Sequence, residues 1–133
     1  AKKNIKRMGL EEKINIIEDD AANVLPKLSG PYDFIFLDAA KAQYIQFLPE
    51  LLRLMPIGGI LVADDVLQGG NIAKSRFSLP RRQRTIHKRM RNFLWDISHL
   101  DCLESSIIPI GDGIVMCTKI KEYVPTEGEF SDD

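Results

Sequence analysis

The chain has 133 residues and a formal net charge of −1, so it can bury one core and its total charge indicates no particular partner. Its apolar stretches are shorter than the ~18 residues that a membrane span needs, and we expect a cytoplasmic protein with no membrane partner. Cys102 and Cys117 lie in apolar segments without metal-ligand spacing. This pattern predicts two buried thiols in a reducing compartment rather than a disulfide bridge.

Helices and strands are predicted to alternate along the first half of the chain. Residues 1–8 look like the end of a helix that stops at Gly9, and the segment 13–18 (KINIIE) alternates like a strand. A short helix over 20–28 is followed by the near-continuously apolar segment 32–37 (YDFIFL), which predicts a buried parallel strand. A helix over about 44–55 comes next and is closed by proline and glycine.

The second half predicts one more parallel strand, a long helix and a terminal hairpin. The apolar segment 59–63 (GILVA) predicts the strand, and a loop holding two glycines leads to a helix over about 80–97. Strands over about 103–109 and 114–119 are joined by a Gly-Asp-Gly turn, which is typical of an antiparallel hairpin. The pattern is that of an α/β fold with a mostly parallel sheet.

The predicted fold lacks the first strands that this kind of α/β pattern usually has. The first residue lies in a predicted helix, and no glycine-rich nucleotide-binding turn follows any strand. We therefore expect residues 1–121 to be the C-terminal part of a larger domain whose first strands are missing. The segment 122–133 is acidic and has little to bury, which predicts a disordered tail.

Acidic side chains follow both predicted parallel strands. Asp38 and Lys41 come after the first strand, and Asp64 and Asp65 end the second. Ligands of open α/β sheets bind at the carboxyl ends of the strands, and three clustered carboxylates suit Mg²⁺ or another hard divalent cation. The alternatives stay open: the acids could simply cap the following helices, and Lys41 could be a solvated lysine at a helix start. Tyr44 is expected to serve packing.

The long predicted helix carries a charge stripe of one sign. Between 66 and 95 the chain has no Asp or Glu but eight Lys or Arg. An apolar face formed by Ile86, Met90, Phe93, Leu94 and Ile97 predicts one buried side of the helix. The basic residues lie on the opposite side, which fits phosphate contacts, although a solvated outer face is the simpler explanation. The basic residues on this side are Arg81, Arg84, Lys88 and Arg91. His87 and His99 have no metal spacing and are expected to be ordinary surface or hydrogen-bonded residues.

Three motifs resemble one protein family. They are D-A-A-K-A-Q-Y at 38–44, G-G-I-L-V-A-D-D-V-L at 58–67 and P-I-G-D-G at 109–113. Together they resemble the class I S-adenosylmethionine-dependent O-methyltransferases of the catechol and caffeoyl-CoA branch. With the cluster R-R-Q-R at 81–84, they are most similar to the bacterial tRNA 5-hydroxyuridine methyltransferases.

The resemblance implies a Rossmann-like methyltransferase fold, with strands in the order 3-2-1-4-5-7-6, and specific site residues. It implies that Asp38, Asp64 and Asp65 bind a divalent metal, although the family usually has Asn where Asp65 stands. It implies S-adenosylmethionine contacts at Asp20, Ala21 and Asp38. Residues 19–21 (Asp-Asp-Ala) match the Gly-Asp-Ala motif of the family only partly, because Asp replaces Gly. Asp38 and Lys41 are the candidate catalytic residues, and Lys41 could accept the substrate's proton.

The expected activity is methyl transfer to a hydroxyl of tRNA 5-hydroxyuridine. In that case Arg81, Arg82, Arg84 and Lys88 would contact the RNA, and we expect a homodimer. A small phenol, catechol-like or linked to CoA, is an alternative acceptor. A fragment that only folds with a partner, without catalysis, is the alternative from another class.

Overall fold

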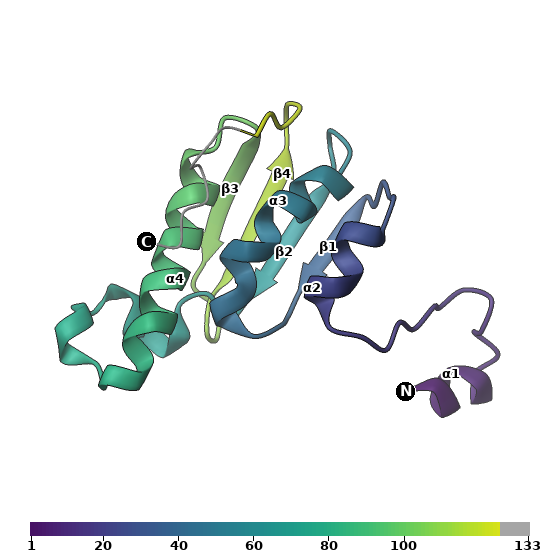
Figure 1. Ribbon diagram of the computed structural model, residues 1–133, viewed down its shortest axis with the longest axis horizontal. Coiled ribbons are helices and arrows are strands. Elements are labelled where there is room, and N and C mark those ends of the chain that lie inside the picture. Colours follow the sequence, from purple (N-terminus) through teal and green to yellow (C-terminus); the bar gives the residue numbers. More distant parts are fainter. Residues whose placement is uncertain (126–133) are drawn as a thin grey trace.

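The computed structural model describes residues 1–125 and shows a four-stranded mixed sheet with two long helices on one face (Figure 1). The predicted tail over 122–133 falls largely outside these residues. None of the described helices is long and apolar enough to cross a membrane. The elements are α1 (Lys2–Arg7), α2 (Ala21–Val24), β1 (Phe34–Leu37), α3 (Tyr44–Leu54), β2 (Ile60–Asp64), α4 (Arg81–His99), β3 (Leu103–Ile108) and β4 (Ile114–Lys119). Short 3₁₀ turns η1 (Leu25–Lys27), η2 (Lys41–Gln43), η3 (Gln68–Ala73) and η4 (Arg76–Ser78) connect them.

The sheet has the order β1-β2-β4-β3. β1 and β2 are parallel, with Leu37 opposite Ala63, whereas β4 runs antiparallel to both β2 and β3. This order is the 4-5-7-6 part of the order that the resemblance implies, so the α/β fold class and the terminal hairpin are confirmed. Within the described residues the parallel part of the sheet is the single pairing of β1 with β2.

The strand predicted over 13–18 is wrong. These residues form no strand, and Ile14 and Ile17 are exposed. An alternating pattern becomes a strand only when a neighbour satisfies its backbone groups, and no described strand lies beside this segment. The segment therefore runs as an extended connection to α1, which stands apart from the sheet (Figure 1).

The core lies between the sheet and helices α3 and α4. Tyr44, Leu48 and Leu52 of α3 and Met90 and Phe93 of α4 are fully buried. On the sheet side, the buried inward residues of β2 and β4 alternate with residues that are half-buried or exposed, as in a sheet covered on one face. The predicted apolar face of α4 is confirmed for Met90, Phe93, Leu94 and Ile97, whereas Ile86 is only half-buried. The helix runs two residues further than expected, to His99. Both cysteines are buried thiols that form no disulfide bridge within the described residues, as predicted.

Buried and bridging cations join the ends of elements that are far apart in the sequence. Lys119, at the end of β4, is almost fully buried and donates from Nζ to the carbonyls of Leu52 (3.0 Å) and Met55 (2.8 Å). It thereby closes the C-terminal end of α3, where carbonyl groups lack partners within the helix. Arg53 donates to the carbonyls of Leu25 and Leu28, both at 2.9 Å, and holds η1 against α3.

Candidate active site at the ends of two parallel strands

The parallel pairing of β1 and β2 brings the candidate acids to one edge of the sheet. Because Leu37 lies opposite Ala63, the next residues, Asp38 and Asp64, come at the same level where the two strands end. Asp38 is exposed, and Asp64 and Asp65 are half-buried. The predicted meeting of these segments at one strand edge is confirmed.

The buried side chain of Tyr44 connects the ends of β1 and β2. It is fully buried and meets the ring of Phe93 edge-on, with centroids 5.6 Å apart. The hydroxyl lies 3.1 Å from the carbonyl of Asp64 and 3.4 Å from that of Leu37, and it accepts from the amide of Ala39 at 3.4 Å. A single oxygen thus contacts the backbone at the ends of both strands. The predicted packing role is confirmed, with positioning added to it.

Burial raises the pKa of the Tyr44 hydroxyl above its usual range. The hydrogen bond from Ala39 opposes this shift, whereas the negative charges of Asp38, Asp65 and Asp64 add to it. All three acids therefore act on one buried oxygen. Tyr44 remains a neutral hydrogen-bonding group at neutral pH.

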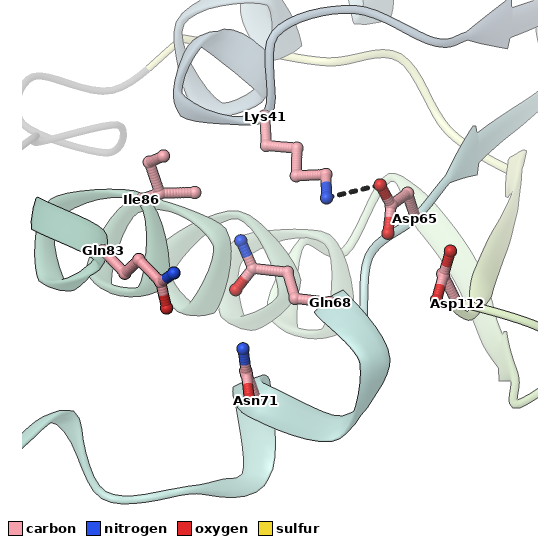
Figure 2. Close-up of a pocket in the computed structure, with 7 residues that line it drawn as sticks. All are labelled: Lys41, Asp65, Gln68, Asn71, Gln83, Ile86 and Asp112. Carbon is pink, nitrogen blue, oxygen red and sulfur yellow. Dashed lines mark ion pairs between the residues drawn. The ribbon is translucent and has the colours of Figure 1, made fainter. Parts of the chain in front are cut away.

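Asp65 is held in an unusual backbone conformation and faces Lys41. Its φ is +61°, in the left-handed region that Asp and Asn tolerate better than most residues. The carboxylate of Asp64 accepts the amide of Asp65 at 2.7 Å, which stabilises this turn. The carboxylate of Asp65 forms an ion pair with Lys41 (Figure 2), with both side chains about one-third exposed. In this pairing Lys41 is a donor, and a role as proton acceptor requires the pair to open.

The expected three-carboxylate metal site is not assembled in this arrangement. Within residues 1–125, no three Asp, Glu, His or Cys side chains come together in a group that could hold a metal ion. The carboxylate of Asp65 is neutralised by Lys41, and one oxygen of Asp64 is occupied by a backbone amide. The residues as placed do not fit a divalent cation, and metal binding stays a prediction.

A pocket of about 370 Å³ opens beside the Lys41–Asp65 pair. All of its lining residues except Ile86 are polar or charged, and Figure 2 shows the amide groups of Gln68 and Asn71 directed into the same space as the pair. Gln83 and Ile86 come from α4, and Asp112 comes from the turn between β3 and β4. The sequence signalled the two loops through their glycines and Gly-Asp-Gly turn, but it did not indicate that Gln68, Asn71, Gln83 and Asp112 share one pocket.

The close packing of two loops places Asp112 at this pocket. The amide of Leu67 donates to the carbonyl of Asp112 (2.9 Å), and the amide of Val66 donates to that of Gly113 (3.1 Å). Gly113 has a φ of +87°, and a Cβ there would lie 2.3 Å from Cγ of Leu67. Only glycine fits this position, so the hairpin turn and the loop after β2 form one wall.

The predicted cofactor residues at the start of α2 have a structural role here. Asp20 is the N-cap of α2 and accepts the amide of Ala22 at 2.9 Å. Asp19 accepts the amide of Asp20 at 2.7 Å. Asp20 and Ala21 are not among the residues lining the pocket beside Lys41, and their contact with a cofactor stays a prediction.

The basic residues of α4 lie on its solvent side, as predicted. Arg81, Arg82 and Arg91 are exposed, and Arg84 and Lys88 are half-buried. The guanidinium of Arg84 is already engaged, because it donates to the carbonyl of Leu79 (3.2 Å) and lies over the ring of Phe77. His87 is buried and hydrogen-bonded to the carbonyl of Lys74 at 3.1 Å, which agrees with the expectation of a satisfied residue.

Residues 1–120 match the family model described as O-methyltransferase. Tapetum-specific methyltransferase 1 of Arabidopsis thaliana is 32% identical over 120 residues, which are 87% of this chain and 52% of that protein. A caffeoyl-CoA O-methyltransferase of Stellaria longipes is 31% identical over 125 residues, with 87% and 51% covered. The chain spans about half the length of the curated relatives it matches.

Solved structures share the fold. The O-methyltransferase of Bacillus cereus, in complex with SAH, gives a TM-score of 0.75 at 21% identity and covers 89% of this chain and 56% of its own. The O-methyltransferase TomG of Streptomyces achromogenes, in complex with SAM, gives 0.76 at 20%, covering 90% and 55%.

The sheet order, with helices on its face and a polar pocket at the strand ends, defines a Rossmann-like α/β fold that these solved structures share. Within that class, the chain belongs to the O-methyltransferase family whose model it matches over residues 1–120.

Proposed function

We propose that the protein transfers a methyl group from S-adenosylmethionine to a hydroxyl oxygen held in the pocket beside Lys41 and Asp65. The observation that supports this most strongly is the position of the pocket, at the carboxyl ends of the two parallel strands. Open α/β sheets bind their ligands there. The family match and the cofactor-bound structures of the same fold support the donor.

Methyl transfer from a sulfonium is an in-line displacement. The acceptor oxygen forms a bond to the methyl carbon while the sulfur–carbon bond breaks, leaving S-adenosylhomocysteine. The acceptor hydroxyl must also lose its proton, which is a task of general base catalysis and positioning. From the ion pair, Lys41 can donate a hydrogen bond to the acceptor oxygen. The carboxylate of Asp65 can accept the proton that the acceptor hydroxyl loses.

We propose 5-hydroxyuridine in tRNA as the acceptor. The pocket is lined by three carboxamides, Gln68, Asn71 and Gln83, each of which can both donate and accept hydrogen bonds. The uracil ring of 5-hydroxyuridine has alternating carbonyl and N–H groups along its edge, which such side chains complement. The one-signed stripe on α4, next to the pocket through Gln83, supplies the positive charge that an RNA backbone requires.

A small phenol is the second candidate acceptor. Its support comes from the relatives, two of which are named caffeoyl-CoA O-methyltransferase of Stellaria longipes and flavonoid 3',5'-methyltransferase of Vitis vinifera. A small phenol needs no extended basic surface, so the stripe distinguishes the two candidates.

Mass spectrometry of tRNA nucleosides tests the choice. Cells lacking the protein should accumulate unmethylated 5-hydroxyuridine, and the wild-type gene should restore the methylated nucleoside. A Lys41→Ala variant should fail to restore it, whereas Lys27→Ala, which changes an exposed lysine on η1, should succeed. An unchanged nucleoside profile, together with methylation of caffeoyl-CoA by the purified protein, would replace tRNA with the small phenol.

A further inference from the structure

The charged stripe of α4 continues into two stacked rings. Taking about 100° per residue, Arg81, Lys88, Arg91, Trp95 and His99 fall within about 80° of one another around the helix. They follow one another at intervals of three, four or seven residues on the side facing away from the buried residues of the helix. The stripe is therefore a ridge about 27 Å long, basic over most of its length and aromatic at its C-terminal end.

The two rings at this end form a stacked pair. The rings of Trp95 and His99 are stacked, with centroids 3.7 Å apart and an angle of 19° between their planes. Nδ1 of His99 is 2.8 Å from the carbonyl of Trp95, and since a carbonyl only accepts, this nitrogen carries the proton. Trp95 is nevertheless 63% exposed, so one large ring is held in place by its neighbour and presented to solvent.

The other end of the ridge repeats this combination of charge and ring. Phe77, in η4, is 78% exposed, and the guanidinium of Arg84 lies 5.8 Å from its ring centroid. Arg84 also donates to the carbonyls of Leu79 and Phe77, which fixes η4 against the start of α4. Exposed aromatic rings thus flank the basic residues at both ends.

We propose that this ridge binds single-stranded RNA, with an unpaired base stacked on Trp95 and phosphates on Lys88 and Arg91. The inference rests on the proposed function for its choice of RNA, and it adds a stacking site that lies several helical turns along α4 from Gln83 of the pocket. A positively charged track combined with exposed aromatic rings is the arrangement that binds unpaired nucleic acid, because every base has a π face. The His99 ring holds Trp95 in place, so less ordering is needed when a base binds.

Two other occupants fit the ridge less well. A basic helix that binds a membrane inserts an apolar face into the lipid. The apolar face of α4 is not accessible, because Met90, Phe93 and Ile97 are buried against the sheet. A second copy packed ridge to ridge would bring two sets of like charges together, which opposes association. The one-signed charge favours a polyanion.

Trp95 is the only tryptophan in the chain, so its fluorescence reports on this site alone. Titration with an oligouridylate of about eight nucleotides should quench the emission when a base stacks on the ring. An abasic oligomer with the same phosphates should bind through charge and leave the emission unchanged. The oligouridylate contains no hydroxyuridine, so the result does not depend on methyl transfer.

Variants separate the ring from the charge. By anisotropy of a labelled oligomer, Trp95→Ala should weaken binding by about 5- to 150-fold, and its salt dependence should stay the same since no phosphate contact is lost. Trp95→Phe, which keeps an aromatic face, should lose much less. Phe34→Ala, at an equally exposed aromatic residue on β1, is the matched control and should not change the affinity.

Four results would overturn the proposal: bound oligouridylate without quenching, equal quenching by the abasic oligomer, quenching by anionic vesicles, or emission that changes with protein concentration alone. The last two would assign the ridge to a membrane or to a second copy. Methylation assays of the same protein keep the two proposals apart. Quenching without any methylation of hydroxyuridine RNA would remove only the proposed function, whereas methylation without quenching would remove only the stacking site.

Discussion

Replacing Tyr44 with Phe removes one oxygen and leaves the ring on Phe93 in place. The oxygen contacts the carbonyl of Asp64 at 3.1 Å, and its two other backbone contacts, with Leu37 and Ala39, are at 3.4 Å. Taking about 1 kcal/mol for the shorter contact and about half of that for each longer one, the variant should lose about 2 kcal/mol of unfolding free energy. With a urea m-value of about 2 kcal/mol/M, the midpoint should fall by about 1 M.

Urea unfolding followed by circular dichroism measures this loss, and Tyr32→Phe, at a partly exposed tyrosine, is the control that should not change the midpoint. An equal midpoint for Tyr44→Phe and the wild type would refute the reasoning that this hydroxyl ties the strand ends together.

The pH dependence of stability gives a second test of the same residue. The pKa of Tyr44 is raised in the folded state, so its contribution is complete below the ordinary tyrosine pKa near 10. Above that pH the unfolded state loses the proton first, and stability falls as pH rises. The Tyr44→Phe variant should show a shallower alkaline decline than the wild type. An identical decline in the two proteins would contradict the cause assigned to the shift.

Four further results are expected. Gly113→Ala should cost about 3 kcal/mol of stability in urea unfolding, because a left-handed φ and a Cβ 2.3 Å from Leu67 act together; a loss below about 1 kcal/mol would show that the loops separate easily. Burial raises the pKa of Cys117, so its thiol should weaken the fold as pH rises above about 9, and Cys117→Ala should flatten that slope in unfolding measured from pH 8 to 10. Lys88→Ala should lower the salt slope of RNA binding by roughly one unit, and no change would remove Lys88 from the phosphate contacts. If activity proves sensitive to EDTA, Asp64→Ala should abolish it while the circular dichroism spectrum stays the same, and unchanged turnover would end the metal hypothesis.

The sequence correctly predicted those elements that periodicity and turn residues define locally. The apolar face of α4, the two parallel strands and the terminal hairpin were all recognisable from periodicity and turn residues, and the structure confirms them. The segment 13–18 has an equally regular pattern but forms no strand. Periodicity states which side of a strand is apolar, whereas pairing depends on a partner elsewhere in the fold.

The candidate site was predictable in its place and not in its contacts. Acids after two apolar runs indicated the strand edge, but the pairing of Asp65 with Lys41 depends on a left-handed backbone turn that the sequence does not specify. Gln68 and Asn71 reach the pocket because a 3₁₀ turn folds the loop after β2 toward α4. The exposure of Trp95 depends on where α4 ends and on which side of it packs against the core, and the sequence pattern did not specify it. Each of these features arises from tertiary contacts.

The position of β4 has a consequence for how the chain folds as it is synthesised. β4 is the last of the four strands in chain order, yet it lies between β2 and β3. While a ribosome is still adding β4, β2 has a free edge on that side and β3 has no neighbour on that side. Lys119, which closes α3, is the last residue of β4 to be added. β2, β3 and α3 are therefore synthesised before the strand that completes their contacts. The sheet and the end of α3 are completed together, after elongation has passed residue 119.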